Sequence, residues 1–178
     1  MGIYTIGHST RSLDEFVDLL RAHAIGRVAD IRTVPRSRRH PHFSADVLGR
    51  SLPAIGVEYR HFPGLGGLRK PRRDSPNGAW RHEGFRGYAD HMGTAEFRDA
   101  LTELIEWSRA DLSPPAPRVA IMCAESVWWR CHRQLTADAL LARGVEVFHI
   151  TGHGPASAHK LTEFARVIEG EVRYPGLI

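Results

Sequence analysis

The sequence predicts one α/β domain over residues 1–178, built in three layers: a largely parallel sheet of five strands with helices on both faces. Short apolar runs alternate along the chain with longer segments of helical periodicity, which is the order of elements in such folds. A chain of 178 residues is long enough to bury a substantial core. It shows no internal repeat and no convincing linker, so we predict a single domain.

The first half of the chain predicts three of the five strands. Residues 3–6 are expected to form the first strand and residues 27–31 the second, and residues 57–62 alternate like a third. Ser12 is expected to begin a helix after the first strand, because Glu15 completes a capping box. The apolar face of this helix would consist of Leu13, Phe16, Val17 and Leu20.

A short helix and a long insertion complete the first half. The helix is expected at residues 44–52 and is stopped by Gly56. Residues 63–87 are rich in glycine, proline and arginine and show little periodicity. We predict an Arg/Gly/Pro-rich loop there, and a loop of this length is usually functional or mobile.

The second half predicts two further strands, at residues 118–122 and 145–150. Thr94 is expected to cap a helix, and residues 134–144 predict another that ends in a glycine. The apolar face of the Thr94 helix would consist of Phe97, Leu101, Leu104 and Ile105. Ser157 is expected to begin a last helix. Its apolar residues would be Leu161, Phe164, Ala165 and Ile168.

The composition excludes several classes of protein. A hydrophobic fraction of 42% and a charged fraction of 25% are ordinary for a globular domain. No stretch approaches the roughly 18 apolar residues of a membrane span, and the first residues form a strand rather than a signal peptide. Two cysteines are too few for a secreted disulfide scaffold. We therefore expect a cytoplasmic protein without a membrane partner.

Positive charge is concentrated in the middle of the chain. Twelve Lys or Arg and only four Asp or Glu lie between Arg32 and Arg86, whereas the rest of the chain is acidic overall. Guanidinium groups match the geometry of phosphate and carboxylate, so this region favours an anionic partner. The alternative is that arginine is simply the usual cation of this chain, which holds only two lysines.

Polar or reactive side chains follow each of the five predicted strands. In open α/β sheets, ligands bind beyond the carboxyl ends of the strands, so these side chains are expected to converge at one edge. They are His8, Ser9, Asp30, Arg32, His61, Cys123, Glu125, Thr151 and His153.

Residues 123–133 hold the densest chemistry, between a predicted strand and a predicted helix. Cys123 is the favoured catalytic nucleophile, because its basic neighbours and the helix N-terminus would stabilise its thiolate. These neighbours are Arg130, His132 and Arg133. The alternatives for Cys123 are a residue that fills the core, a ligand, or a disulfide partner of Cys131.

Glu125, His8 and His132 are the candidate acid/base residues. Glu125 would serve as a general acid/base, or as the nucleophile of a glycosyl transfer, and the alternative is a salt bridge to Arg130 or Arg133. His8 lies in a short polar turn after the first strand, where the alternative is a hydrogen bond to the backbone of a neighbouring strand. The substrate is expected to contact Ser9, Asp30, Arg32, Arg36, Arg38, Arg130, Cys131 and Arg133.

No cofactor is predicted. Cys123, Cys131 and His132 are potential metal ligands that a distal histidine, His8 or His61, would complete. The spacings of zinc knuckles and of the His-Glu-x-x-His helix are both absent, however. A redox- or metal-dependent cysteine protein is kept as an alternative.

Two basic blocks with nearby aromatic residues suit a nucleic acid as partner. Guanidinium groups bind phosphates and aromatic rings stack on bases, which is the composition of surfaces for single-stranded nucleic acid. The blocks are Arg32, Arg36, Arg38, Arg39 and His40, and Arg69, Lys70, Arg72 and Arg73; the aromatic residues are Tyr59, Phe62, Trp80, Phe85 and Tyr88. Solvated loops over a few core aromatic residues would have the same composition.

Motifs in several places resemble a family of bacterial and archaeal proteins, the domain-of-unknown-function family 488. The matching segments are residues 5–10, 30–37, 64–67, 85–89, 122–125 and 130–133. The resemblance implies a single α/β domain and marks the same residues at the strand ends.

The C-terminal half is also similar to rhodanese-like domains. A cysteine after a strand, then an arginine, a helix and a strand ending in Thr151 carry this resemblance, and Asp30 with Arg32 resembles the Asp-x-Arg of rhodaneses. It implies a thiolate in a cradle of backbone amides, and sulfur or phosphoryl transfer. The sequence departs from the related phosphatase loop in the long spacing to Arg130 and in the acidic Glu125.

The residues together favour an enzyme that binds a phosphate-bearing substrate, either a nucleotide or a nucleic acid, at the carboxyl ends of the strands. With Cys123 as nucleophile it would be a cysteine-dependent transferase or hydrolase. A non-catalytic nucleic-acid-binding domain with structural cysteines is the main alternative.

Overall fold

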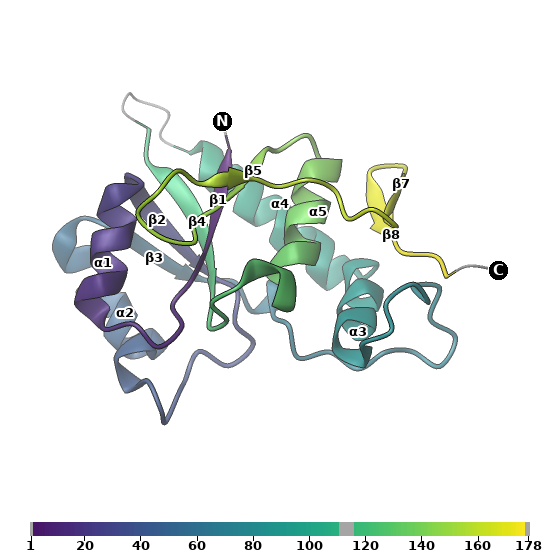
Figure 1. Cartoon of the computed structure of the whole chain (residues 1–178), viewed down its shortest axis with the longest axis horizontal. Helices are drawn as coiled ribbons and strands as arrows, with labels where there is room; N and C mark the ends of the chain where they lie inside the picture. Colours follow the sequence, from purple (N-terminus) through teal and green to yellow (C-terminus); the bar gives the residue numbers. More distant parts are fainter. Residues whose placement is uncertain (1, 111–115, 177–178) are drawn as a thin grey trace.

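The computed structural model describes residues 2–110 and 116–176, which form the predicted α/β fold around a six-stranded sheet (Figure 1). The strand order is β3-β2-β4-β1-β5-β6, and only β6 runs antiparallel to its neighbour. The bounds are β1 Ile3–Gly7, β2 Ile25–Asp30, β3 Glu58–His61, β4 Arg118–Cys123, β5 Val147–His149 and β6 Ser157–Ala158. The five predicted strands are present, and β6 adds a sixth.

Five α-helices and four short 3₁₀ turns accompany the sheet in the described ranges. The helices are α1 Leu13–Ala22, α2 Ala45–Ser51, α3 Glu83–Met92, α4 Ala95–Arg109 and α5 Arg133–Ala142. The turns are η1 Pro41–Phe43, η2 Pro53–Ile55, η3 Pro63–Leu65 and η4 Trp128–Arg130. None of the described helices has the length and apolar character needed to cross a membrane.

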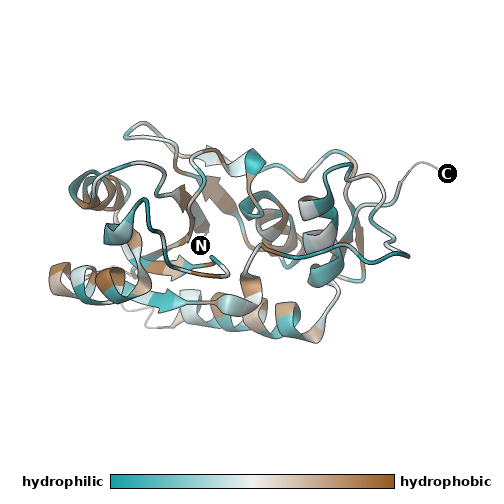
Figure 2. Cartoon of the chain, turned by 90° about the horizontal axis from the view of Figure 1, so that it is seen from below, coloured by the Kyte–Doolittle hydropathy of each residue, from teal (hydrophilic) through white to brown (hydrophobic). Residues whose placement is uncertain are grey.

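Two apolar clusters, one on each face of the sheet, attach the helices. Successive residues of β4 alternate between them: Val119 and Ile121 belong to the first cluster, Ala120 and Met122 to the second. The first cluster holds buried residues of α3, α4 and α5, whereas the second holds those of α1 and α2. Figure 2 shows hydrophobic residues, in brown, along the central strands. The three predicted layers are therefore present.

The helix boundaries predicted at Ser12, Thr94 and Gly144 are present in the structure. Ser12 and Glu15 form the capping box of α1, with the Glu15 N–H donating to Ser12 Oγ and the Ser12 N–H to Glu15 Oε2. Thr94 accepts a hydrogen bond from the backbone of Phe97 at the start of α4. Gly144 follows α5 with a φ of +74°, a conformation that glycine adopts without strain.

The helix predicted from Ser157 is wrong. Residues 157–158 pair with β5, and the chain then forms a hairpin of β7 Arg166–Ile168 and β8 Glu171–Arg173. Glu169 and Gly170 at its tip both have positive φ, at 52° and 78°, which suits a two-residue hairpin turn and is incompatible with a helix. Strand pairing therefore outweighs the helical spacing of the apolar residues here.

The predicted loop at residues 63–87 is shorter than expected, because α3 begins at Glu83. The periodicity of α3 is hard to detect in the sequence. Its buried positions include His91 and Gly87 as well as the apolar residues Tyr88, Ala89 and Met92. A histidine and a glycine on the core face weaken the apolar pattern on which the prediction relied.

Candidate functional site

A cleft of about 810 Å³ lies where the chain leaves β1, β2 and β4. Most of the predicted site residues line it: His8, Ser9, Arg32, Arg36, Cys123, Glu125, Arg130, Cys131 and His132. The structure does not bring Asp30, Arg38 or Arg133 to this surface, nor the strand-end residues His61, Thr151 and His153. The ends of β1, β2 and β4 thus contribute to the cleft, whereas the predicted contributions after β3 and β5 are not among its lining residues.

Other lining residues were not among the predicted site residues. They include Arg39, His40, Gly67, Leu68, His82 and Phe85. Arg39 and His40 belong to the first basic block. Gly67 belongs to the glycine run of residues 64–67, one of the segments that match the family, so the sequence did indicate these three residues. His82 is the N-cap of α3 and carried no signal, because that helix was not predicted.

His8 is buried directly after β1. Its Nδ1 lies 2.9 Å from the carbonyl oxygen of Ser9, and its ring stacks on Phe43 with centroids 4.2 Å apart. Nδ1 therefore donates its hydrogen, which leaves Nε2 to accept from Arg32 at 3.3 Å. Burial lowers the pKa of His8 to about 4, so the ring is neutral at pH 7. The backbone bond that the sequence left as an alternative exists, but to the next residue rather than to another strand.

Asp30 lies beneath the cleft and holds Arg32 in place. The Arg32 Nε donates to Asp30 Oδ1 at 2.9 Å, and Nη2 donates to Oδ2 at 2.6 Å. Arg32 also donates to the carbonyl oxygen of Phe43, and the Tyr59 hydroxyl donates to Asp30 at 2.7 Å. Burial, together with the nearby Asp30, raises the pKa of Tyr59 well above its usual value. Asp30 is thus a support for the cleft, and it neutralises the charge of Arg32.

Cys123, Cys131 and His132 form a compact cluster in the lining of the cleft. The Nδ1 of His132 lies 3.9 Å from the Sγ of Cys123 and 3.6 Å from the Sγ of Cys131. Both cysteines are free and buried. Within the described residues, this is the group of His, Cys, Asp or Glu side chains that could hold a metal ion, with all three donor atoms within 4.8 Å of one another. The distal histidine that the sequence offered as a further ligand does not join this cluster, because His8 and His61 bond backbone carbonyls elsewhere.

The ring of His132 has a defined orientation. Its Nε2 lies 2.8 Å from the carbonyl oxygen of Ile31, the residue that follows β2. Because a carbonyl only accepts, Nε2 carries a hydrogen, and Nδ1 faces the two sulfur atoms. Parallel pairing of β2 with β4 brings Ile31 beside the cysteine loop, residues 123–133.

The two thiols differ in acidity. Burial opposes ionisation of Cys131, but a hydrogen bond from Cys123 and contacts with His132 and Arg133 hold the pKa of Cys131 well below its usual value. The pKa of Cys123 is raised well above its usual value, because its thiol donates to Cys131 and is buried. Of the two thiols, Cys131 is therefore the more acidic, whereas the sequence favoured Cys123 as the nucleophile.

Arg133 is fully buried and closes the cysteine loop from behind. Its Nε donates to the Sγ of Cys131 at 3.4 Å, and its Nη2 donates to the backbone carbonyls of Glu125 and Ser126. A Cβ at Gly7 would collide with the Glu125 carbonyl, so only glycine fits against this part of the loop. Arg133 therefore shapes the loop, and it is not among the residues that line the cleft.

Gly67 packs against the cluster from the glycine run. A Cβ at this position would lie 2.4, 2.7 and 2.8 Å from Nδ1, Cγ and Cε1 of His132. Such similar distances to three ring atoms place the Cα of Gly67 over the face of the imidazole. The in-plane direction at Nδ1 is left to the sulfur atoms.

Three exposed arginines line the cleft, namely Arg36, Arg39 and Arg130. None of them forms an ion pair with another described residue. Glu125 is the only acidic residue among those that line the cleft, and in the described ranges its carboxylate has no ion pair either. The salt bridge that the sequence left as an alternative for Glu125 is therefore not formed, and the cleft is positively charged overall.

Two of the four cations of the second basic block and most of the aromatic residues are engaged within the protein. Arg69 pairs with Glu96, and Arg72 pairs with Asp74. The rings of Phe62 and Tyr88 are almost completely buried. Trp80 packs against Phe85, Phe164 and Tyr174. Of the five aromatic residues named from the sequence, Phe85 lines the cleft.

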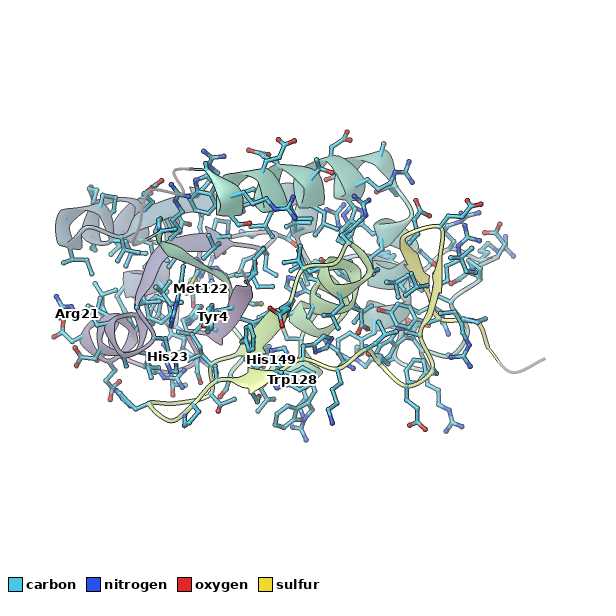
Figure 3. All side chains as sticks on the ribbon, turned by 90° about the horizontal axis from the view of Figure 1, so that it is seen from above. Tyr4, Arg21, His23, Met122, Trp128 and His149 are labelled. Carbon is cyan, nitrogen blue, oxygen red and sulfur yellow. The ribbon has the colours of Figure 1, made fainter. Side chains whose placement is uncertain are left out.

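Trp128, which lies between the two cysteines in the sequence, is placed beside His149 (Figure 3). Its ring stacks on His149 of β5, with centroids 3.8 Å apart and planes 2° from parallel. His149 accepts from Thr5 at Nδ1 and approaches His159 with Nε2 at 2.9 Å. His159 in turn donates to Asp138 of α5 at 2.9 Å. A buried hydrogen-bonded chain thus supports the segment that carries Arg130 and Cys131.

Comparison with known proteins gives one match. The family model described as "Domain of unknown function DUF488" matches residues 12–140, which is well over half of the chain and includes both cysteines. No curated protein and no solved structure matches significantly. The resemblance to this family is therefore confirmed, whereas the similarity to rhodanese-like domains stays a prediction. The chain belongs to the DUF488 family.

Proposed function

We propose that this protein is an enzyme that binds a phosphate-bearing substrate of nucleotide size in the cleft and acts on it with the Cys123–Cys131–His132 cluster. One observation carries the proposal: exposed arginines without ion pairs and a cysteine–histidine cluster line the same cleft. The arginines supply binding, and the cluster supplies reactivity. Enzymes commonly combine a pocket with a few convergent polar groups in this way.

The charges favour a phosphate group as the part of the substrate that is recognised. Arg36, Arg39 and Arg130 approach the cleft from two different segments and keep their donors available. Guanidinium groups bind phosphate oxygens in a bidentate manner, and such charge-assisted hydrogen bonds are about twice as strong as neutral ones. Because Asp30 neutralises its charge, Arg32 would orient a bound substrate more than attract it.

The shape favours a small molecule over a nucleic-acid strand. A volume of about 810 Å³ falls within the usual range for small-molecule and cofactor sites. Val34, Leu68 and Phe85 add apolar surface, which suits the non-phosphate part of a nucleotide. Continuous nucleic-acid surfaces need a series of exposed rings, and Phe62 and Tyr88 are buried instead.

The test is calorimetric binding of nucleoside mono-, di- and triphosphates to the metal-free protein. Arg36→Gln and Arg130→Gln should each weaken binding by about 10-fold or more, because a hydrogen bond to a charged group contributes roughly 1.5–3 kcal/mol. Arg38→Gln is the matched control, since Arg38 is equally exposed in the same block but does not line the cleft. Its affinity should stay unchanged.

An equal loss of affinity in Arg38→Gln and Arg36→Gln would contradict the proposal. The basic block would then act as a diffuse surface, and the nucleic-acid alternative would gain. In that case, binding of a single-stranded oligonucleotide should fall steeply with salt, and the slope should become shallower in each arginine variant.

A further inference from the structure

We propose that Cys123, Cys131 and His132 form a zinc site whose fourth coordination position opens into the cleft. Zinc in proteins binds sulfur at about 2.3 Å and nitrogen at about 2.0 Å in tetrahedral geometry, which places neighbouring S and N ligands about 3.5 Å apart. In this chain the corresponding S–N distances are 3.6 and 3.9 Å. The Nδ1 of His132 thus already stands at nearly the spacing from both sulfur atoms that a tetrahedral zinc ion requires, and the three donor atoms all lie within 4.8 Å of one another.

The orientation of His132 fits a metal ligand. Ligating histidines usually donate their second ring N–H to a carboxylate or a backbone carbonyl, which fixes the tautomer and the direction of the free nitrogen. His132 does this through Nε2 and the carbonyl oxygen of Ile31. Gly67 lies over the ring face and leaves the plane of the ring clear at Nδ1.

The surroundings of the sulfur atoms fit as well. Arg133 donates to the Sγ of Cys131, and it is fully buried and held by the loop carbonyls. A cation that hydrogen-bonds a thiolate offsets the negative charge that two thiolate ligands bring to a buried site. With two sulfur ligands and one nitrogen ligand, the set suits zinc rather than magnesium or calcium.

Three protein ligands make this a site of the catalytic type. Structural zinc sites are closed by four protein ligands, whereas catalytic ones leave a position for water or substrate. Cys123, Cys131 and His132 all line the cleft, so that position faces the substrate space. The role of the open position rests on the proposed function, while the metal site itself does not. The thiols would then serve as ligands rather than as nucleophiles.

The test is a titration of metal-free, reduced protein with Co²⁺, which reports its ligands by absorption. We expect binding of one Co²⁺ per chain, with sulfur-to-cobalt charge-transfer bands, the intense visible bands of tetrahedral cobalt, and displacement by Zn²⁺. Cys123→Ser, Cys131→Ser and His132→Gln should each lower the affinity by more than the roughly 10–100-fold that loss of an outer-shell partner costs. His153→Gln is the control, since His153 is an exposed histidine outside the cleft.

A second measurement needs no variant and so does not depend on variant folding. In the wild-type protein, Zn²⁺ should slow the alkylation of Cys123 and Cys131 together, as followed by peptide mass spectrometry. Absence of sulfur-to-cobalt bands in the wild type, or an unchanged affinity in Cys131→Ser, overturns the proposal. The proposal is also overturned if Zn²⁺ does not slow the alkylation of the two cysteines, or if a Cys123–Cys131 disulfide forms in its presence. Because nucleotide binding is measured on metal-free protein, a failure of the zinc site leaves the proposed function to be judged separately.

Discussion

The carboxylate of Asp30 accepts hydrogen bonds from Arg32 and from Tyr59 in a fully buried position. Asp30→Asn would leave the guanidinium of Arg32 buried without its counter-charge. Removal of one partner from a buried ion pair is strongly destabilising, by about 3–5 kcal/mol. We therefore expect the free energy of unfolding of Asp30→Asn, measured in urea, to fall by roughly this amount.

The exposed pair of Arg72 and Asp74 provides the comparison for this variant. Its atoms approach to 2.8 Å, but both side chains face solvent, so water and salt screen the attraction. Asp74→Asn should leave the free energy of unfolding nearly unchanged. A similarly small effect in Asp30→Asn would mean that Arg32 finds a replacement partner. Asp30 would then not be what holds Arg32 in place beneath the cleft.

Which residues meet in the cleft could be predicted from the sequence, but the direction of individual side chains could not. His8 and Cys123 come together because they follow neighbouring parallel strands, which the apolar runs already indicated. Asp30 and Arg133 are also charged residues in segments that reach this edge of the sheet, yet their side chains are buried in the protein. Besides nearby residues, Asp30 bonds the distant Tyr59, and Arg133 bonds backbone carbonyls of the cysteine loop. No local pattern encodes those contacts.

At the scale of elements, the segment after η3 positions the imidazole of His132 through Gly67. A Cβ at Gly67 would overlap the ring, which the Ile31 carbonyl prevents from moving away. Gly67→Ala should therefore lower the free energy of unfolding by roughly 1–3 kcal/mol, the usual effect of overpacking. It should also weaken Co²⁺ binding if the ring turns. Thermal unfolding and the cobalt titration measure the two effects.

Gly154→Ala is the control for that substitution. No atom lies within 4 Å of a Cβ at Gly154, and its backbone is not in the left-handed region. The two measured quantities should match those of the wild type. If Gly67→Ala behaved in the same way, the glycine run would owe its presence to something other than contact with His132.

Elements were predictable where their signals were local. Ser12 and Thr94 mark helix starts through side-chain bonds to residues three positions later, and both helices form as expected. The segment after Ser157 has helical spacing but no capping bond, and pairing with β5 decides its structure. The helix α3 shows the opposite failure, because His91 interrupts its apolar face while bonding the carbonyl oxygen of Gly64.

At the scale of the molecule, a buried chain of hydrogen bonds joins β1, β5, α5 and the C-terminal segment. Thr5, His149, His159, Asp138 and Tyr174 are its members. Burial, with His159 and Arg133 nearby, lowers the pKa of His149 to about 3, from an ordinary value of 6.5. In the unfolded chain the same histidine binds a proton near that ordinary value.

The stability of the fold should therefore depend on pH. Between pH 6.5 and about 3 the unfolded state binds more protons at His149 than the folded state, so the free energy of unfolding falls as the pH is lowered through this range. His8 acts in the same direction. His149→Phe keeps a ring against Trp128 but removes the titrating group, so its stability should vary less steeply with pH. Urea unfolding at several pH values provides the measurement, and parallel curves for the two proteins would refute the assignment.

The order of the strands also affects how the chain folds during synthesis. β1 and β2 do not pair with each other; both pair with β4, which is made only after residues 2–110 have been completed. A nascent chain that ends before Arg118 therefore carries two central strands with unpaired edges, the kind of surface that associates with other chains. The strand that fills this gap also brings Cys123. The same segment thus joins the two central strands and brings the first residue of the cysteine–histidine cluster into place.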